Sequence, residues 1–164
     1  DSEKYEDAAW DAVRFNNPFK FPMTTAPAMV VQNGQFLGQR MSYWVNPGQE
    51  TTVHVTKALS LTTRHAEQEQ PGERETLNIG GRTYRKVLVK GELSLANHRK
   101  DAAKVVARRR FSGELIKADA EPKKQLCEEG VYSVNTRSEL IWTVELKAGE
   151  TRTIGYSYSV LVAH

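Results

Sequence analysis

The chain has 164 residues, of which 26% are charged and 39% hydrophobic, with 23 Lys and Arg against 20 Asp and Glu. This length favours a single domain with a core of its own. The aliphatic and aromatic content excludes intrinsic disorder, and no apolar run reaches the roughly 18 residues of a membrane span. The single cysteine, Cys127, excludes an internal disulfide and a cysteine-rich zinc site, and the net charge of +3 is too small to indicate a nucleic-acid partner.

The first residues of the chain are acidic, beginning with Asp1 and Glu3. They lack the basic, apolar and small-residue pattern of a signal peptide. Because the first residue is not Met, we expect the chain to be a piece of a longer protein. We predict one domain over residues 1–164, in which residues 1–18 form a linker or a first strand. Residues 5–13 also permit a helical turn or two.

Alternation of apolar and polar residues, which is typical of strands with one buried face, dominates the chain. Its first instances are residues 28–31 and 35–37, joined by the strong hairpin turn Asn33-Gly34. Residues 41–45 and 51–55 alternate in the same way on either side of a turn that contains Pro and Gly. We predict a second hairpin there.

The middle of the chain continues the pattern. Residues 58–63 and 87–95 alternate, and Gly91 interrupts the second run. Between these runs, residues 64–75 contain no apolar residue except one alanine, so we expect a solvated surface loop. A polar turn then leads into a further predicted strand at residues 103–111.

The only helical signals in the second half are weak. Residues 118–130 are polar and predict another surface loop. Within them Pro stands where a first helical residue would lie and Gly where a helix would end, so residues 121–130 permit one short helix. Residues 131–134 return to a strand pattern.

The clearest alternation comes last, in residues 140–146 and 154–162. The polar turn between them, residues 147–150, contains a glycine available for positive φ, and together the three segments predict a β-hairpin with Trp142 in the core. Many short strands joined by Gly, Pro and Asn turns predict an all-β fold. We expect an elaborated antiparallel immunoglobulin-like β-sandwich with at most one or two short helices.

One internal similarity stands out. Residues 48–55 resemble residues 149–156 in register, and each segment follows a strand with a tryptophan, Trp44 or Trp142. Two explanations are open. Hairpins share turn chemistry, or the two halves of the sandwich are related.

Four segments in order carry a resemblance to a known family: FPMTTAPAMVVQNGQFLGQ (21–39), WVNPGQETTVHV (44–55), GELSLANHRKDAAKVVARRRFSGEL (91–115) and WTVELKAGETRTIGYSYSVLV (142–162). From about Phe19 to Val162 the chain resembles the C-terminal β domain of mucoidy-inhibitor-A-like proteins, a domain family of unknown function. The resemblance implies a β-sandwich and favours the cell envelope or another extracytoplasmic location. It implies no catalytic residues.

No catalytic or metal-binding motif is present. The four histidines, His54, His65, His98 and His164, form no i, i+4 pair and no HExxH motif, and we interpret them as surface residues. Acidic neighbours disfavour a thiolate at Cys127, which we interpret as incidental. We therefore predict no cofactor, no metal site and no enzymatic activity.

Three consecutive arginines are the sharpest charge feature. Alternation places Arg108 and Arg110 on the outward face of their strand, where a solvated surface or a binding patch would fit. It places Arg109 on the more apolar face. There Arg109 would pair with a carboxylate, lie at an open strand end or mark a bulge.

Trp44 is the clearest candidate anchor for a ligand. We expect Met41, Tyr43 and Val45 to point inward, which leaves Trp44 and Arg40 on the polar side of the strand. An outward tryptophan would stack on a sugar or anchor a protein partner, or it would lie under a loop such as residues 64–75.

These observations predict a non-catalytic β-sandwich module that has a structural or protein-interaction role beside other domains of its parent chain or another protein. The alternative is a carbohydrate- or cell-envelope-binding module, and a hydrolase is third. We predict no nucleic-acid partner and no membrane span, and a glycan stays open as a ligand. The candidate binding surface consists of Trp44, Arg40, Arg108 and Arg110.

Overall fold

The structure is a computed structural model that describes residues 8–72, 75–127 and 133–163. Within these ranges the chain is all-β, with twelve strands joined by turns and no helix, as the alternation predicts. The chain divides into two compact units, unit 1 (residues 1–59) and unit 2 (residues 60–164), which we describe separately. The prediction of one domain over residues 1–164 stays a prediction.

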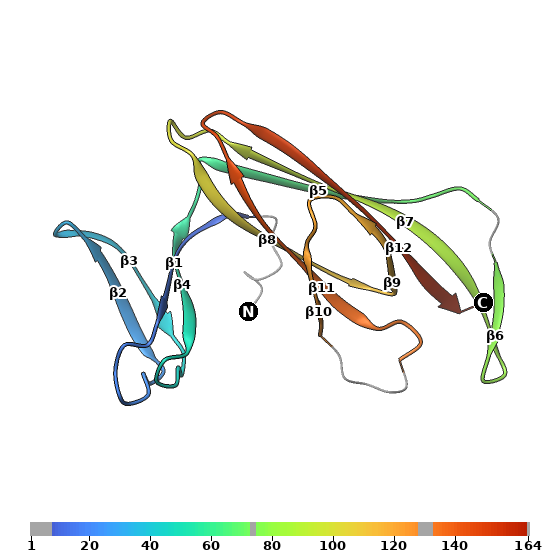
Figure 1. Ribbon diagram of the computed structural model, residues 1–164, viewed down its shortest axis with the longest axis horizontal. Helices are drawn as coiled ribbons and strands as arrows, with labels where there is room; N and C mark the ends of the chain where they lie inside the picture. The colour runs from blue at the N-terminus through green and yellow to red at the C-terminus, as the bar shows by residue number, and fades with distance from the viewer. Residues whose placement is uncertain (1–7, 73–74, 128–132, 164) are drawn as a thin grey trace. The chain divides into compact units, whose positions relative to one another are not determined.

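Unit 2 is a sandwich of two antiparallel sheets (Figure 1). One sheet has three strands in the order β10-β11-β8. The other has five, in the order β5-β7-β12-β9, with β6 beside β7. The strands are β5 (Leu61–Glu69), β6 (Thr76–Ile79), β7 (Arg82–Asn97), β8 (Ala103–Ser112), β9 (Glu114–Ala118), β10 (Lys123–Leu126), β11 (Arg137–Leu146) and β12 (Thr151–Ala163).

The core of unit 2 lies between these sheets. Leu140, Trp142 and Leu146 of β11 are fully buried together with Ile154 and Tyr156 of β12. Each such side chain stabilises the fold by roughly 2 kcal/mol through burial of apolar surface. The predicted inward faces of both strands are confirmed.

Unit 1 contains two pairs of antiparallel strands, β1 with β4 and β2 with β3. The β2–β3 pair is the hairpin that the Asn33-Gly34 turn predicts, and both turn residues have positive φ. The strands are β1 (Trp10–Asn16), β2 (Ala26–Gln32), β3 (Gln35–Ser42) and β4 (Glu50–Lys57).

Two predicted hairpins are wrong, because the strands on either side of the turn belong to different sheets. Gly149 has the expected positive φ of 68° in the turn between β11 and β12. Yet β11 pairs with β8 while β12 pairs with β7, so the turn carries the chain from one sheet to the other. The same holds for β3 and β4, which pair with β2 and β1. Alternation predicts a strand but does not identify its neighbour.

The structure also decides four weaker predictions. The possible helix at residues 121–130 is replaced by β10, which pairs with β11, and residues 128–130 lie outside the described ranges. The first half of the predicted loop at residues 64–75 belongs to β5, whose pairing with β7 extends to Glu69. For the strand predicted at residues 131–134, the described residues 133 and 134 lie outside any strand. The first strand begins at Trp10, in place of a helical turn.

The four strands of unit 1 repeat the register of four strands in unit 2. A residue of β1 or β2 has its counterpart 80 positions later in the chain, in β7 or β8. Ala28, for example, corresponds to Arg108. Residues of β3 and β4 correspond to residues of β11 and β12 that are 101 positions later, as Gly38 does to Glu139. The matching pairs are Val13↔Val53 with Leu93↔Ile154, Pro27↔Met41 with Ala107↔Trp142, Ala28↔Arg40 with Arg108↔Ile141, and Val30↔Gly38 with Arg110↔Glu139.

A buried asparagine also recurs, Asn17 in unit 1 and Asn97 in unit 2. The side-chain oxygen of each asparagine accepts a hydrogen bond from the backbone N–H two residues later. Its side-chain NH₂ group donates to the backbone carbonyl four residues later and to a second carbonyl, which lies at the end of a strand or in a β-bridge. These bonds satisfy backbone groups at the turns where the chain changes sheet. The similarity of residues 48–55 to residues 149–156 is thus part of a larger repeat. The partners are Phe19, Phe21 and Val45 for Asn17, and Arg99, Asp101 and Leu146 for Asn97.

The two units differ in which face of the repeated hairpin is covered. In unit 2 the face of β8 and β11 that carries Ala107 and Trp142 is buried in the core. In unit 1 the opposite face packs on β4, so closely that a Cβ at Gly38 would lie 2.7 Å from the Val55 carbonyl oxygen. The absence of a side chain at Gly38 allows this approach. The corresponding residue in unit 2, Glu139, has a long charged side chain.

Candidate functional site

A group of ionisable side chains in mutual contact lies on the core side of the five-stranded sheet of unit 2. Tyr156 of β12 pairs in register with Gly91 of β7, and Gly91 pairs with Glu67 of β5. Because Gly91 has no side chain, the Tyr156 ring lies across it, and a Cβ at Gly91 would overlap the ring. The Tyr156 hydroxyl thereby reaches Glu67 from two strands away.

The Glu67 carboxylate accepts hydrogen bonds from two hydroxyl groups, those of Tyr156 (2.6 Å, to Oε1) and Tyr158 (3.2 Å, to Oε2). Arg109 places Nη2 3.1 Å from Glu67 Oε1, and its Nε donates to the Tyr156 oxygen at 3.1 Å. His65 Nε2 lies 2.8 Å from the same oxygen. Since that hydroxyl donates to Glu67, His65 must donate through Nε2–H.

Arg109 joins the two sheets. It comes from β8, an edge strand of the three-stranded sheet, and Glu67 comes from β5, an edge strand of the other sheet. The ion pair therefore bridges the sandwich along one side. The hypothesis that the inward Arg109 pairs with a carboxylate is confirmed.

The contacts within this group lower the pKa of Glu67 and raise the pKa of Tyr156, which fixes the protonation state of both. Burial raises the pKa of Glu67, but hydrogen bonds from Tyr156 and Arg109 outweigh burial and hold that pKa below its usual value. Burial and the neighbouring Glu67 carboxylate raise the pKa of the Tyr156 hydroxyl well above its usual range. Near neutral pH the group is thus a carboxylate saturated with donors, which suits a structural bridge.

Sequence reasoning missed two members of this group. His65 was interpreted as a surface residue and Glu67 fell in the predicted loop, but their side chains are only 17% and 23% exposed. The signal was present, because Thr63, His65 and Glu67 alternate along β5. Because all three residues are polar, their alternation lacks the apolar–polar contrast by which a strand is predicted.

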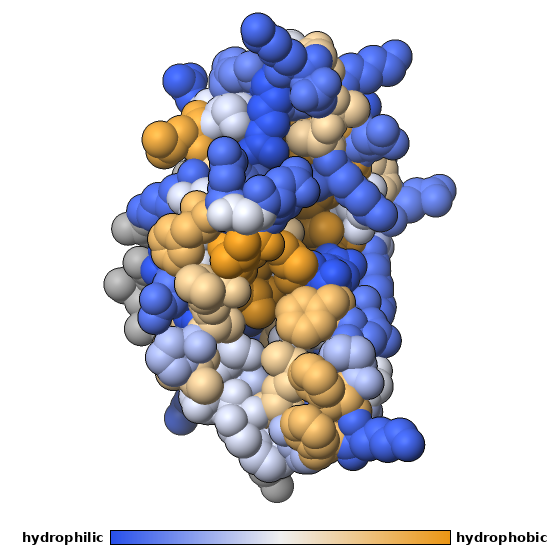
Figure 2. Space-filling model, turned by 90° about the vertical axis from the view of Figure 1, so that its left-hand side faces the viewer, coloured by the Kyte–Doolittle hydropathy of each residue, from blue (hydrophilic) through white to orange (hydrophobic). Residues whose placement is uncertain are grey.

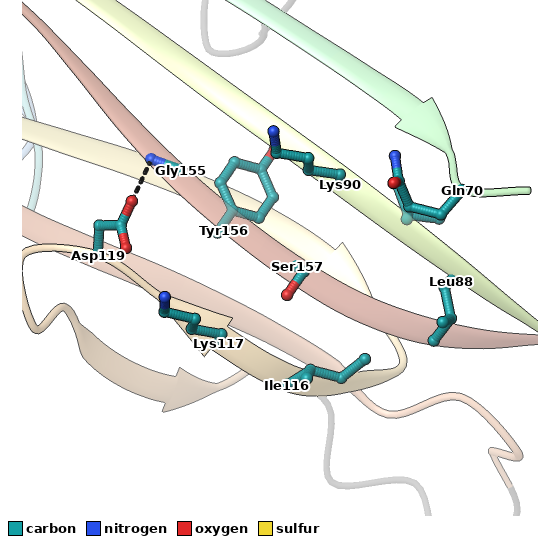
Figure 3. Close-up of a pocket in the computed structure, with 10 residues that line it drawn as sticks. Gln70, Leu88, Lys90, Ile116, Lys117, Asp119, Gly155, Tyr156 and Ser157 are labelled. Atoms are coloured by element: carbon teal, nitrogen blue, oxygen red, sulfur yellow. Dashed lines mark hydrogen bonds between the residues drawn. The ribbon is translucent and has the colours of Figure 1, made fainter.

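The opposite face of β12 carries an open groove of about 340 Å³ (Figure 3). Gly155 and Ser157, which alternate with Tyr156, line it between side chains of β7 and β9. The Asp119 carboxylate accepts a hydrogen bond from the Gly155 N–H at 3.2 Å, drawn as a dashed line in Figure 3. Asp119 is the only carboxylate among the described residues that line the groove, and no pair of acidic side chains converges there among them. The other lining residues are Gln70, Leu88, Val89, Lys90, Ile116 and Lys117.

The second candidate site is the uncovered face of the β2–β3 hairpin in unit 1, which we call the hairpin face. Residues 27, 29 and 31 of β2 are exposed, whereas residues 26, 28 and 30 are partly buried. Met29 is 66% exposed and Phe36 is 62% exposed. Figure 2 shows apolar side chains gathered on this side of the molecule. The hairpin face consists of Pro27, Met29, Val31, Phe36, Gln39 and Met41.

The exposed apolar surface continues into the residues that follow β3. Met41 and Tyr43 are exposed, so the prediction that they point inward is wrong, while Val45 is buried as expected. Trp44 is 57% exposed, and its Nε1 donates to Asn46 Oδ1 at 3.0 Å. The indole is thus held at one edge.

The predicted binding residues are divided between the two units. Trp44 and Arg40 belong to unit 1, where the Arg40 guanidinium lies 4.8 Å above the centre of the Trp10 ring. Arg108 and Arg110 belong to unit 2. There both donate to the Glu139 carboxylate, each at 3.1 Å.

That arrangement explains why Glu139 is almost buried on an outward strand face. Arg108 and Arg110 are two residues apart on β8, and Glu139 pairs with Arg110 across the sheet. The two guanidinium groups cover the carboxylate, whose side chain is only 9% exposed, while they remain more than half exposed themselves. The outward placement of both arginines is as predicted.

The remaining candidate features are the single cysteine, a metal-binding cluster and a membrane-spanning helix. Cys127 is exposed. Among residues 8–72, 75–127 and 133–163, no three His, Cys, Asp or Glu side chains form a cluster that could hold a metal ion. The same residues contain no helix of the length and apolarity needed to cross a membrane.

Comparisons with known proteins give no relative. No protein-family model, no curated protein and no solved structure matches the chain.

Proposed function

We propose that the chain is a non-catalytic β module that binds another protein surface through the hairpin face of unit 1. The observation that carries the proposal is the exposure of Met29, Val31, Phe36 and Met41 on one side of a two-stranded hairpin. Apolar side chains gathered in this way on a folded surface are typical of an interaction site. The resemblance to an envelope-associated family supports a role outside the cytoplasm.

The polar group in unit 2 supports a structural role there. A general acid or base needs a pKa near the working pH. Hydrogen bonding instead lowers the pKa of Glu67 while burial raises that of Tyr156, so both groups keep one protonation state around neutrality.

The test is capture of a partner by the wild-type chain and by Phe36→Asp. We expect a specific partner to be captured by the wild type and lost with Phe36→Asp, because a buried carboxylate without a counter-ion opposes apolar docking. Leu126→Asp is the matched control, since Leu126 is an exposed apolar residue of a unit 2 strand, β10. Titration of the purified partner then checks that binding is direct. If no captured protein depends on Phe36, the proposal fails.

A second candidate is a carbohydrate-binding module, which the exposed Trp44 favours. With Nε1 held by Asn46, the indole is partly ordered before a sugar stacks on it. We expect Trp44→Ala to abolish binding to any glycan that the wild type binds, while the free energy of unfolding changes by less than about 0.5 kcal/mol. A glycan screen followed by calorimetric titration measures this. Absence of glycan binding by the wild type would eliminate the candidate.

A further inference from the structure

We infer that the surface which docks on the hairpin face is the hairpin face of a second copy of this chain, so that the protein forms a symmetric dimer. This inference rests on the proposed function, since it identifies the partner of the same face. It follows from the repeat within the chain, from the charges around the face and from the area that the face offers.

The repeat shows what this kind of surface does when it is covered. Through the shared register, Pro27 corresponds to Ala107, Met29 to Arg109 and Met41 to Trp142. In unit 2 this face of β8 and β11 forms one wall of a sandwich core against a second sheet. The hairpin face therefore has the position of a core wall, and its natural complement is another apolar sheet face about 10 Å away.

The charges around the hairpin face are compatible with a second copy of the chain as the opposing sheet face. No acidic residue occurs from Ala12 to Gln49, and the only charged residues there are Arg14, Lys20 and Arg40. None of them belongs to the hairpin face, and Arg40 lies on the opposite face, above Trp10. Two copies can therefore meet face to face without bringing like charges together, which would cost several kcal/mol in a charged interface. A two-fold axis requires only that the face be complementary to itself.

The size of the face sets the expected affinity. A large apolar side chain offers roughly 150–200 Å² of surface, so five that are about half exposed provide roughly 500 Å² per copy. A symmetric pair would bury roughly 1,000 Å², which is near the lower limit for a specific interface. We therefore expect a dimer with a dissociation constant in the micromolar range. Four of these side chains, Met29, Val31, Phe36 and Met41, belong to the hairpin face, and the fifth is Tyr43, which follows β3 and continues the exposed apolar surface.

The test is sedimentation equilibrium of the full chain across the micromolar range. We expect the wild-type mass to rise from one to two copies with concentration, and Met29→Asp to weaken association by at least 10-fold. Met29→Lys should weaken it equally. Leu126→Asp, which alters unit 2, should behave as the wild type, and circular dichroism checks that each variant is folded.

A wild-type chain that stays monomeric at all concentrations would overturn the inference, as would a dimer unaffected by Met29→Asp. In the first case, a heterologous partner lost with Phe36→Asp would still support the proposed function. If neither a dimer nor a partner lost with Phe36→Asp were found, the dimer inference and the proposed function would both be wrong.

Discussion

Gly91→Ala is expected to lower the free energy of unfolding by about 3 kcal/mol, since the new methyl group would overlap the Tyr156 ring. The ring cannot move without giving up its hydroxyl contacts with Glu67, Arg109 and His65. Urea unfolding at neutral pH measures the change. If Gly91→Ala unfolds at the wild-type urea concentration, the proposed packing of Tyr156 across β7 is wrong.

Two further variants separate this overlap from the general effect of adding a methyl group. Gly72→Ala is the matched control, because a Cβ at Gly72 meets no atom within 4 Å, and we expect a change within about 0.5 kcal/mol. Tyr156→Ala removes the ring, so Gly91→Ala should cost much less in that background. A coupling of about 2 kcal/mol between the two sites is expected, whereas additive effects would contradict direct contact.

Glu67→Gln is expected to lower the free energy of unfolding by about 2 kcal/mol at pH 7. The substitution keeps the shape of the side chain but leaves the partly buried Arg109 without its counter-charge. The hydrogen bonds from Tyr156 and Arg109 also lose the strength that an ionised acceptor gives them. The cost stays below that of a fully buried pair because Arg109 is about one-third exposed to solvent.

The pH dependence of this difference has a definite sign. The pKa of Glu67 is lower in the folded state than in the unfolded chain, so its contribution is fully present above the unfolded pKa of roughly 4.3. The contribution is lost as the pH falls through the folded pKa. Urea unfolding of wild type and Glu67→Gln should therefore differ by a constant amount from neutral pH to about pH 5.5 and converge in more acidic solution.

The control for electrostatics in general is Glu92→Gln. Glu92 lies on the same sheet and pairs with Lys90 at 3.2 Å, but both side chains are more than half exposed. Such a pair contributes less than about 1 kcal/mol. If Glu92→Gln and Glu67→Gln gave equal losses at every pH, the buried position of Glu67 would have no special role.

Much of the fold was predictable because alternation is a local property. The inward faces of β11 and β12, the turn at Asn33-Gly34 and the all-β class follow from the side-chain pattern alone. Pairing is not local. Residues 147–150 form the predicted turn, yet the strands on either side enter different sheets, because the same turn geometry serves a hairpin and a crossing between layers.

In the candidate sites, too, the face on which a side chain lies was predictable from the local pattern, whereas its partner was not. The inward placement of Arg109 was predicted from β8, but its partner Glu67 lies 42 residues away, on a strand hidden by its polar sequence. Gly91 was visible only as an interruption in an apolar run. Its role depends on Tyr156, which pairs with it across the sheet.

Length and composition predict a folded chain, the single cysteine excludes an internal disulfide, and the alternation of side chains predicts the all-β class. The sequence by itself also determined which side chains alternate together, since that depends only on neighbouring residues. Tertiary structure decided which of those faces is covered. Gly38 lets one side of the unit 1 hairpin pack closely on β4, whereas its counterpart Glu139 is covered by Arg108 and Arg110, which are themselves more than half exposed. This choice depends on how closely two layers can approach, and it leaves Met29 and Met41 exposed where unit 2 builds its core.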